Sequence, residues 1–323
     1  MEFIKKLIRQ REFMIFMVVA VMFVFMSFAS PYFLISGNLL ALLLALTLEA
    51  LIAVAMTNLM ASGGFDMSVG SVVAFTGAVV ATLMKMGIPI PLAVLAGLCI
   101  SAAAGMFNGF TVAVIGINPF VTTLASLSIF RGLTLIITQG KNIAPLPAAF
   151  NAIGQTKILG IQSPIWITLF FIIMGDILLR KSRFFRQNYF IGGNEKTARL
   201  SGIPVTKMKI FNYTLTGLFA GIAGVILTSR LGAASVTTGT GLELRVITAV
   251  IIGGASLGGG EGTVLGAFLG SLLMAIIINA LNLLGVDVYW HTFVIGATLL
   301  IAVLIDRFGK IRRDRQAVRK TNG

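Results

Sequence analysis

The sequence predicts an all-α, polytopic bundle of about ten membrane-spanning helices, and three observations support this fold class. Of the 323 residues, 57% are hydrophobic and only 11% are charged, and the mean hydropathy is +0.98. Long stretches carry almost no charge, and a bilayer-spanning helix needs about 20 largely apolar residues. Basic residues gather at the ends of these stretches. We expect the whole chain, 1–323, to form a single membrane domain.

Apolar windows between glycine, proline and polar breakers define the expected spans. In order, they are 12–30, 38–61, 66–86, 91–115, 119–139, 164–181, 210–231, 241–257, 262–284 and 288–306. The window 241–257 is short and rich in glycine, so we expect a broken or re-entrant helix there. The apolar run of the first window is longer than that of a signal peptide, so we expect it to be retained as a helix.

Three basic clusters predict the orientation of the chain. They lie near the N-terminus, in a loop at 181–209 with its flanks, and in a tail at 307–323. With ten spans, these clusters share one side of the membrane, which the positive-inside rule assigns to the cytoplasm together with both termini. The net charge of +14 does not indicate nucleic-acid binding, because the cations flank apolar spans.

A glycine-rich pattern followed by an acid occurs twice, at 63–69 and at 258–264, each time before an apolar span. The glycines allow a tight turn, and the helix dipole favours an acid near a helix start. We expect both copies to form helix-start turns on the cytoplasmic side.

Polar groups inside the spans are candidates for pathway or structural roles, because hydrocarbon excludes them at a cost of a few kcal/mol or more for an ionised group. Glu49 and Arg131 fall near the middle of two spans, so their opposite charges predict a buried ion pair. A contact of either with substrate is the alternative. The candidates for a translocation pathway are Asn58, Asp66, Asn108, Thr122, Arg131 and Asn279. Hydrogen bonds between helices would explain each neutral member equally well.

The loop 181–209 contains the pattern of a short capped helix. Asn194 is a good N-cap, Glu195 suits the positive helix end, and Gly202 can adopt the left-handed conformation that ends a helix. A helix this short is marginal alone, so we expect it to dock against something.

With this loop, the chain resembles the permease subunits of bacterial ATP-binding-cassette (ABC) importers of the ribose and xylose type. The segments that carry the resemblance, over nearly the whole chain, are 66–71, 192–204, 239–244, 253–257 and 282–286. In that family, a cytoplasmic coupling helix with a Glu-Ala-Ala…Gly motif fits a groove on the ATPase. The resemblance implies that the coupling residues are Asn194, Glu195, Ala198, Arg199 and Gly202.

The chain departs from this family at four positions. Thr197 replaces the first alanine of the coupling motif. Arg245 stands where an acid is common, Glu261 where a base is common, and Glu49 where a neutral polar residue is common. These charge changes bear on the pathway or on partner contacts, and hence on which sugar is carried.

The resemblance implies a subunit of an importer in the bacterial inner membrane, carrying a simple pentose-like or hexose-like sugar by alternating access. Its partners would be a second permease chain, an ATPase pair that binds ATP and Mg²⁺, and a periplasmic or extracellular solute-binding protein. The chain has no Gly-x-x-x-x-Gly-Lys-Ser/Thr phosphate loop, so we expect it to hold no cofactor or metal and to be no enzyme itself.

Other kinds of transporter remain as alternatives. Within the importer class, the solute could be a branched-chain amino acid or a furanone-like signal. Outside it, the chain could be a secondary transporter driven by an ion gradient. Such transporters usually bury carboxylates along their path, and Glu49 is the clear mid-span acid here.

Overall fold

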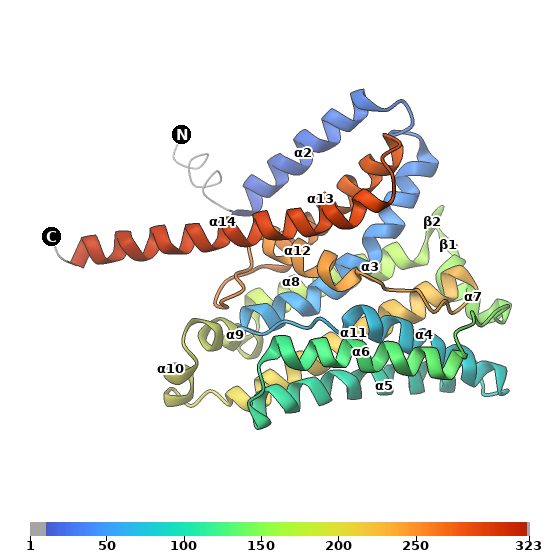
Figure 1. The fold of residues 1–323 in the computed structure, drawn as a ribbon, viewed down its shortest axis with the longest axis horizontal. Coiled ribbons are helices and arrows are strands. Elements are labelled where there is room, and N and C mark those ends of the chain that lie inside the picture. Colours follow the sequence, from blue (N-terminus) through green and yellow to red (C-terminus); the bar gives the residue numbers. More distant parts are fainter. Residues whose placement is uncertain (1–10, 322–323) are drawn as a thin grey trace.

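The computed structural model describes residues 11–321, and the chain is almost entirely helical (Figure 1). Eight helices of the described residues are long and apolar enough to cross a membrane. They are α2 (Arg11–Ala29), α3 (Ser36–Ala61), α5 (Ile90–Phe110) with its π-helical extension η1 (Thr111–Ile115), α6 (Pro119–Thr138), α8 (Ser163–Lys181), α11 (Val205–Leu231), α13 (Val264–Leu283) and α14 (Tyr289–Thr321). The prediction of an all-α membrane bundle is confirmed.

Two of the ten predicted windows hold shorter helices, α4 (Val69–Lys85) and α12 (Leu242–Ile252). At 1.5 Å per residue these are about 26 and 17 Å long. The remaining elements are α7 (Ala148–Gln155), α9 (Arg183–Gly193), α10 (Glu195–Leu200) and a small hairpin of β1 (Lys157–Ile158) and β2 (Ile161–Gln162). The expected break in the window 241–257 is therefore present, and the window 66–86 also holds a shortened helix.

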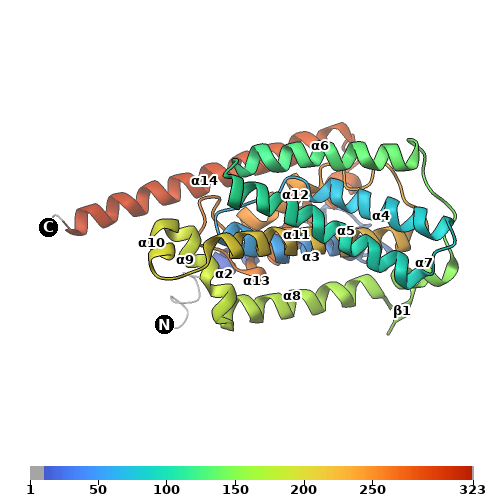
Figure 2. The ribbon, with the colours of Figure 1, turned by 90° about the horizontal axis from the view of Figure 1, so that it is seen from below.

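The bundle has two distinct ends, and Figures 1 and 2 agree on their contents. At the α10 end lie α9, α10 and the last described turns of α14, whereas α7 and the β1–β2 hairpin lie at the α7 end. The helix α11 runs between the two ends and packs against α3, α4, α5 and α7. The basic cluster within 1–10 and the side chains of 309–323 lie outside the described residues.

Glycines allow α11 to approach α5 closely. A Cβ atom at Gly217 would lie 2.8 Å from Gly105 N, and one at Gly109 would lie 2.8 Å from Ile210 Cα. Lipid supplies no hydrophobic drive for two helices to associate, so such small residues provide the close van der Waals packing instead. The bundle therefore has a tightly packed spine along α5 and α11.

The two glycine patterns meet at the α10 end. Gly260 N donates a hydrogen bond to the carbonyl of Ala61 at 2.9 Å, and a Cβ atom at Gly259 would lie 2.9 Å from Gly63 N. Gly192 of α9 packs against the same backbone. Both copies lead into helices, as expected, and they also join the two halves of the chain at this end.

The helices α4 and α12 begin back to back inside the bundle. From there α4 runs toward the α7 end, where Met84 packs in a cluster with Phe150. The helix α12 runs the opposite way, toward the glycine segments of the α10 end (Figure 1). At their starts, a Cβ atom on Gly239 would lie 2.9 Å from Gly70 C, and Gly239 has a φ of 72°. Only glycine fits both the contact and the conformation there.

Candidate functional site

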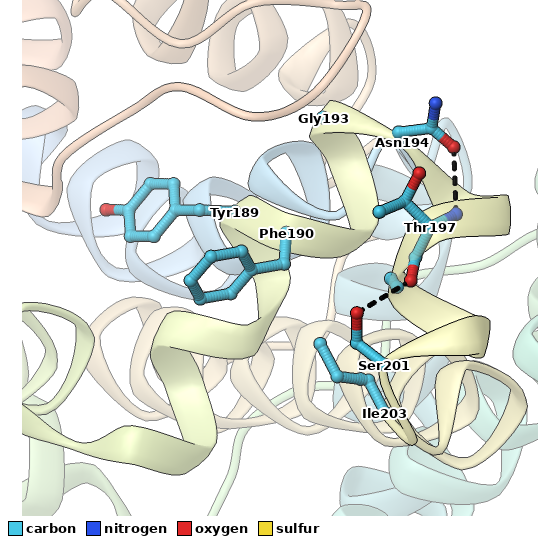
Figure 3. A pocket seen from close by; sticks show the side chains of 8 residues that line it. Tyr189, Phe190, Gly193, Asn194, Thr197, Ser201 and Ile203 are labelled. Atoms are coloured by element: carbon cyan, nitrogen blue, oxygen red, sulfur yellow. Dashed lines mark hydrogen bonds between the residues drawn. The ribbon is translucent and has the colours of Figure 1, made fainter.

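The helix α10 forms between the two caps that its sequence indicates. Asn194 Oδ1 accepts a hydrogen bond from Thr197 N at 3.0 Å, as Figure 3 shows. Gly202 has a φ of 80°, and its N–H donates to the carbonyl of Arg199 at 3.0 Å. Both ends of this single six-residue helix are thus satisfied by backbone or capping groups.

One face of α10 is anchored and the other is free. Ala198 is buried in a small apolar cluster with Ile191, Val205 and Met208, which come from α9 and α11. Leu200, by contrast, is 89% exposed at the end of the bundle. A single exposed leucine is ordinary on a protein surface, so Leu200 indicates a docking surface only together with a hollow that opens between α9 and α10.

Glu195 links α10 to α11 through its two carboxylate oxygens. Oε1 lies 2.8 Å from Arg199 Nη2 on the same helix, and Oε2 lies 2.6 Å from Lys209 Nζ on α11. Burial alone would raise the pKa of Glu195, but the hydrogen bonds and charges of Lys209 and Arg199 outweigh it and lower the pKa below its ordinary value. The carboxylate is therefore ionised and held within the chain.

A hollow of about 430 Å³ opens between α9 and α10 (Figure 3). It is lined by Tyr189, Phe190, Gly193, Asn194, Thr197, Ala198, Ser201 and Ile203. The hydroxyl of Tyr189 donates to the carbonyl of Gly262 at 2.6 Å, which ties α9 to the second glycine pattern. The hollow, the exposed Leu200 and the caps together form the candidate docking surface at the α10 end.

The expected pair of Glu49 with Arg131 is wrong. Glu49 Oε1 lies 2.7 Å from Arg245 Nε on α12. Arg131 instead donates from Nη1 to the carbonyls of Val236 and Thr238, both at 2.9 Å. The physical reason is that α12 packs against α3 and begins inside the bundle. Arg245 is thereby placed beside Glu49, and the coil before α12 beside Arg131.

The pair that forms explains two of the departures from the family pattern. Glu49 and Arg245 are the residues whose charges replace the more common neutral and acidic ones, and in the structure each compensates the other. The Glu49 side chain is only 8% exposed, and its second oxygen, Oε2, has no hydrogen-bond partner among the described residues. The contact is thus an ion pair on a buried carboxylate, made through one of its two oxygens.

Two pathway candidates, Asp66 and Asn108, belong to one buried network. Asp66 Oδ1 accepts from the N–H of Ser68 at 2.7 Å and from its hydroxyl at 2.6 Å. Asn108 Nδ2 donates to Asp66 Oδ2 at 3.2 Å, and Ser126 Oγ donates to Asn108 Oδ1 at 2.5 Å. The network joins the start of α4 to α5 and α6, so these groups bond one another in this conformation.

Three further candidates also lie among helices. Asn279 exchanges two hydrogen bonds with Asn38 of α3, at 2.7 and 3.2 Å. Asn58 donates to the carbonyl of Val54 at 3.1 Å, and Thr122 is buried with no partner for its hydroxyl among the described residues. Arg131, a charged pathway candidate, is itself partly exposed.

Sequence reasoning missed two charged residues, Lys209 at the α10 end and Glu243 at the start of α12. Lys209 lies 14 residues beyond Glu195 in the next helix, so no local spacing pairs them. Glu243 begins α12, and its Oε2 contacts the position that a side chain would occupy at Gly70. The sequence feature that could have indicated Glu243 is an acid at the start of a short helix flanked by glycines. Among the described residues, no three His, Cys, Asp or Glu side chains gather as a metal site.

Comparisons with known proteins cover most of the chain. A family model described as "Branched-chain amino acid transport system / permease component" matches residues 38–303. The chain is 42% identical to the ribose import permease protein RbsC of Bacillus subtilis over 290 residues, which are 89% of this chain and 90% of that protein.

Two relatives from Escherichia coli are almost as similar. The chain is 38% identical to the ribose import permease protein RbsC over 290 residues, or 88% of this chain and 90% of that protein. It is 38% identical to the L-arabinose transport system permease protein AraH over 291 residues, or 90% of this chain and 89% of that protein. No solved structure matches the chain significantly.

Proposed function

This chain belongs to the family of branched-chain amino acid transport system permease components, and from that premise we propose that it is the permease subunit of an ATP-driven importer for a simple sugar. It is a multi-pass inner-membrane protein with eight long apolar helices among its described residues. A pentose-like sugar is supported by the relatives that import ribose and L-arabinose, since each aligns over about nine-tenths of both chains.

The complex that we propose divides the work among separate subunits. ATP and Mg²⁺ bind to a separate ATPase, which docks at the α10 end in the cytoplasm, and both termini of this chain lie on that side. A solute-binding protein delivers the sugar to the α7 end, and a second permease chain completes the membrane part. The basic residues around 181–209 and in 307–323 support this orientation.

The main support for the proposed docking site is the contrast between the two faces of α10. Its inner face is fixed by buried Ala198, whereas Leu200 is 89% exposed. Asn194 and Gly202 cap the helix, so it is formed before a partner arrives. A preformed helix with an exposed apolar side chain loses little entropy when it enters a groove of the ATPase.

The path from α10 into the membrane runs through α11. Lys209 holds Glu195 at the start of α11, and further along that helix Gly224 packs against Val73 of α4, where a Cβ atom would lie 2.6 Å from Val73 O. A movement of α10 would therefore shift α11 together with α4. The two shorter helices, α4 and α12, both start inside the bundle and are called half-spans. Rigid helical groups that move in this way provide alternating access.

Leu200→Asp tests the docking site, with Leu200→Met as the matched control. Because Leu200 is exposed, we expect both variants to fold with unchanged thermal stability. The aspartate variant should lose co-purification of the ATPase and ATP-dependent sugar uptake, while the methionine variant keeps both. Retention of both properties by Leu200→Asp would remove α10 as the docking element.

The family description supports a second solute class, the branched-chain amino acids. Uptake of ribose, arabinose, leucine and a furanone signal by proteoliposomes, each with its loaded binding protein, separates these alternatives. We expect a pentose to be accumulated and leucine to be excluded.

A further inference from the structure

We propose that Arg131, Glu243 and the hydroxyl-bearing coil 235–240 form a mid-bundle strip that binds the hydroxyl groups of the sugar in transit. This inference rests on the proposed function and names the groups that the sugar would meet. Five neutral or acidic pathway candidates bond other helices or are buried, so their capacity to bind a solute is limited in this conformation. Among the described residues, the coil hydroxyls bond only within the coil, where Ser235 Oγ lies 3.1 Å from Thr237 Oγ1 and Thr240 Oγ1 donates to the carbonyl of Thr237 at 2.8 Å. Because Thr237 and Thr240 are exposed, a solute can reach these groups.

The strip lies well inside the span of the bundle. Arg131 is 12 residues beyond the start of α6 at Pro119, or about 18 Å along the helix. The coil 235–240 ends where α12 begins, and there Gly239 packs against Gly70 at the start of α4. Since α4 and α12 run from this point toward opposite ends, the strip is at the depth where the two half-spans start.

The strip is partly open in the described part of the chain. Thr237 and Thr240 are exposed, and Arg131 and Glu243 are partly exposed. Figure 1 shows α12 between α6 and α14. The backbone of the coil forms turns, in which Thr238 N and Thr240 N donate to the carbonyls of Ser235 and Thr237 at 3.2 and 3.3 Å. Lipid cannot satisfy the remaining polar groups of the coil or its hydroxyls. Water and a polar solute can.

The charges of the strip attract each other without closing on each other. Arg131 and Glu243 carry opposite charges, yet no ion pair joins them in the described part of the chain. The carboxylate of Glu243 accepts from the backbone N–H groups of Gly241 and of Glu243 itself, which leaves further acceptor sites on its two oxygens. Arg131 uses Nη1 on the carbonyls of Val236 and Thr238, and its Nε and Nη2 have no hydrogen-bond partner among the described residues. A hydroxyl group is both a donor and an acceptor, so it can accept from Arg131 and donate to Glu243.

This chemistry suits a small polar solute better than a second protein copy. A second protein copy seated there would have to desolvate two charged side chains, which is costly without matched partners. A free amino acid could place its carboxylate on Arg131 and its ammonium on Glu243, so the comparison of pentose uptake with leucine uptake separates these two solutes. A pentose in water carries both donors and acceptors on adjacent carbons, so it can replace water at the strip with little loss of hydrogen bonding.

Thiol labelling tests whether water reaches the strip. Thr240→Cys is made in a Cys99→Ala background, because Cys99 is exposed and is the one native cysteine. Ile129→Cys is the control, since Ile129 is 49% exposed on α6 but lies two residues, or about 200°, from Arg131. We expect a membrane-impermeant methanethiosulfonate to modify Thr240→Cys in the assembled complex and to leave Ile129→Cys unmodified.

Two outcomes of the labelling would overturn the strip. If neither Thr240→Cys nor Ile129→Cys reacts with the reagent, the strip lies against lipid or protein and not against water. A disulfide between the Thr240→Cys residues of two chains would assign the face to contact between copies of the permease.

A specificity ratio tests the role of Glu243 in binding the sugar. Uptake of ribose and of a deoxyribose is measured with the same binding protein, loaded with each sugar, for the wild type and for Glu243→Gln. The preference of the binding protein cancels when the two ratios are compared. Loss of a hydrogen bond to a charged group should shift the ratio by about tenfold, and Glu243→Asp should restore part of it.

The controls separate this proposal from the proposed function. Lys207→Ala removes one exposed charge far from the strip and should leave the ratio unchanged. A wild-type complex that moves sugar, with the same ratio in Glu243→Gln, overturns the strip alone. A wild-type complex that moves no sugar removes both proposals.

Discussion

Two carboxylates, Glu195 at the α10 end and Glu49 inside the bundle, are both held by cations, but in opposite surroundings. Glu195 is 40% exposed and meets two cations, Arg199 and Lys209. Glu49 is 8% exposed, and among the described residues it meets Arg245 alone and keeps one oxygen without a hydrogen-bond partner. Solvent screens the first site, so its bonds can break and re-form at small cost. At the second site, removal of either partner would leave a buried charge without a counter-ion or water, which is destabilising.

The difference separates a movable link from a fixed support. Glu195 joins a partner-facing helix to α11, where a bond of modest free energy can follow the motion of the ATPase. Glu49 and Arg245 hold the half-span α12 against α3, next to the proposed sugar strip. We therefore expect mutations of the buried pair to act on stability and those of the exposed link to act on coupling.

The largest effect is expected when the buried pair is broken. Glu49→Ala or Arg245→Ala alone leaves one buried charge uncompensated, at a cost of about 3 to 5 kcal/mol. Thermal unfolding of the detergent-purified protein measures this loss. The double variant Glu49→Leu with Arg245→Leu removes both charges and should recover much of the stability. Single variants as stable as the wild type would contradict a structural role for the pair.

A smaller change in stability, with a large change in transport, is expected for Lys209→Ala. The Glu195–Lys209 bond is partly exposed, so its loss should cost no more than about 1 kcal/mol. The number of sugars imported per ATP hydrolysed should fall, because α10 is then less firmly joined to α11. Lys207→Ala removes a neighbouring exposed lysine and serves as the control. An unchanged transport stoichiometry in Lys209→Ala would show that the bond is only structural.

The smallest effect is expected from pH. The pKa of Glu195 is lowered from its ordinary value of 4.5, so the link stabilises the folded protein above that pH. The stabilisation is lost as the pH falls below 4.5 and through the lowered pKa of the folded state. Between pH 6 and 8 the contribution of Glu195 to stability should be constant. Glu195→Gln should remove this acid dependence, which comparison of unfolding temperatures at about pH 4 and pH 7 can detect.

The sequence could predict contacts between residues that are close in the chain, but not contacts between distant helices. Asn194 and Gly202 cap α10 through groups three to five residues apart, so their roles could be inferred from the sequence. The partner of Glu49 could not, because the spans are apolar on most sides and their periodicity does not say which helices are neighbours. The short window at 241–257 indicated a broken helix, but not that its start would meet the start of α4.

The most direct test of the central claim, that this chain is driven by a separate ATPase, is sugar uptake into proteoliposomes under controlled energy supply. The chain is reconstituted with the ATPase, ATP and Mg²⁺ are enclosed on the side of α10, and loaded binding protein is added outside. Ionophores collapse the proton and sodium gradients. We predict that sugar still accumulates and that it requires the enclosed ATP. Uptake that persists without ATP and stops when the gradients collapse would contradict the account and favour a secondary transporter.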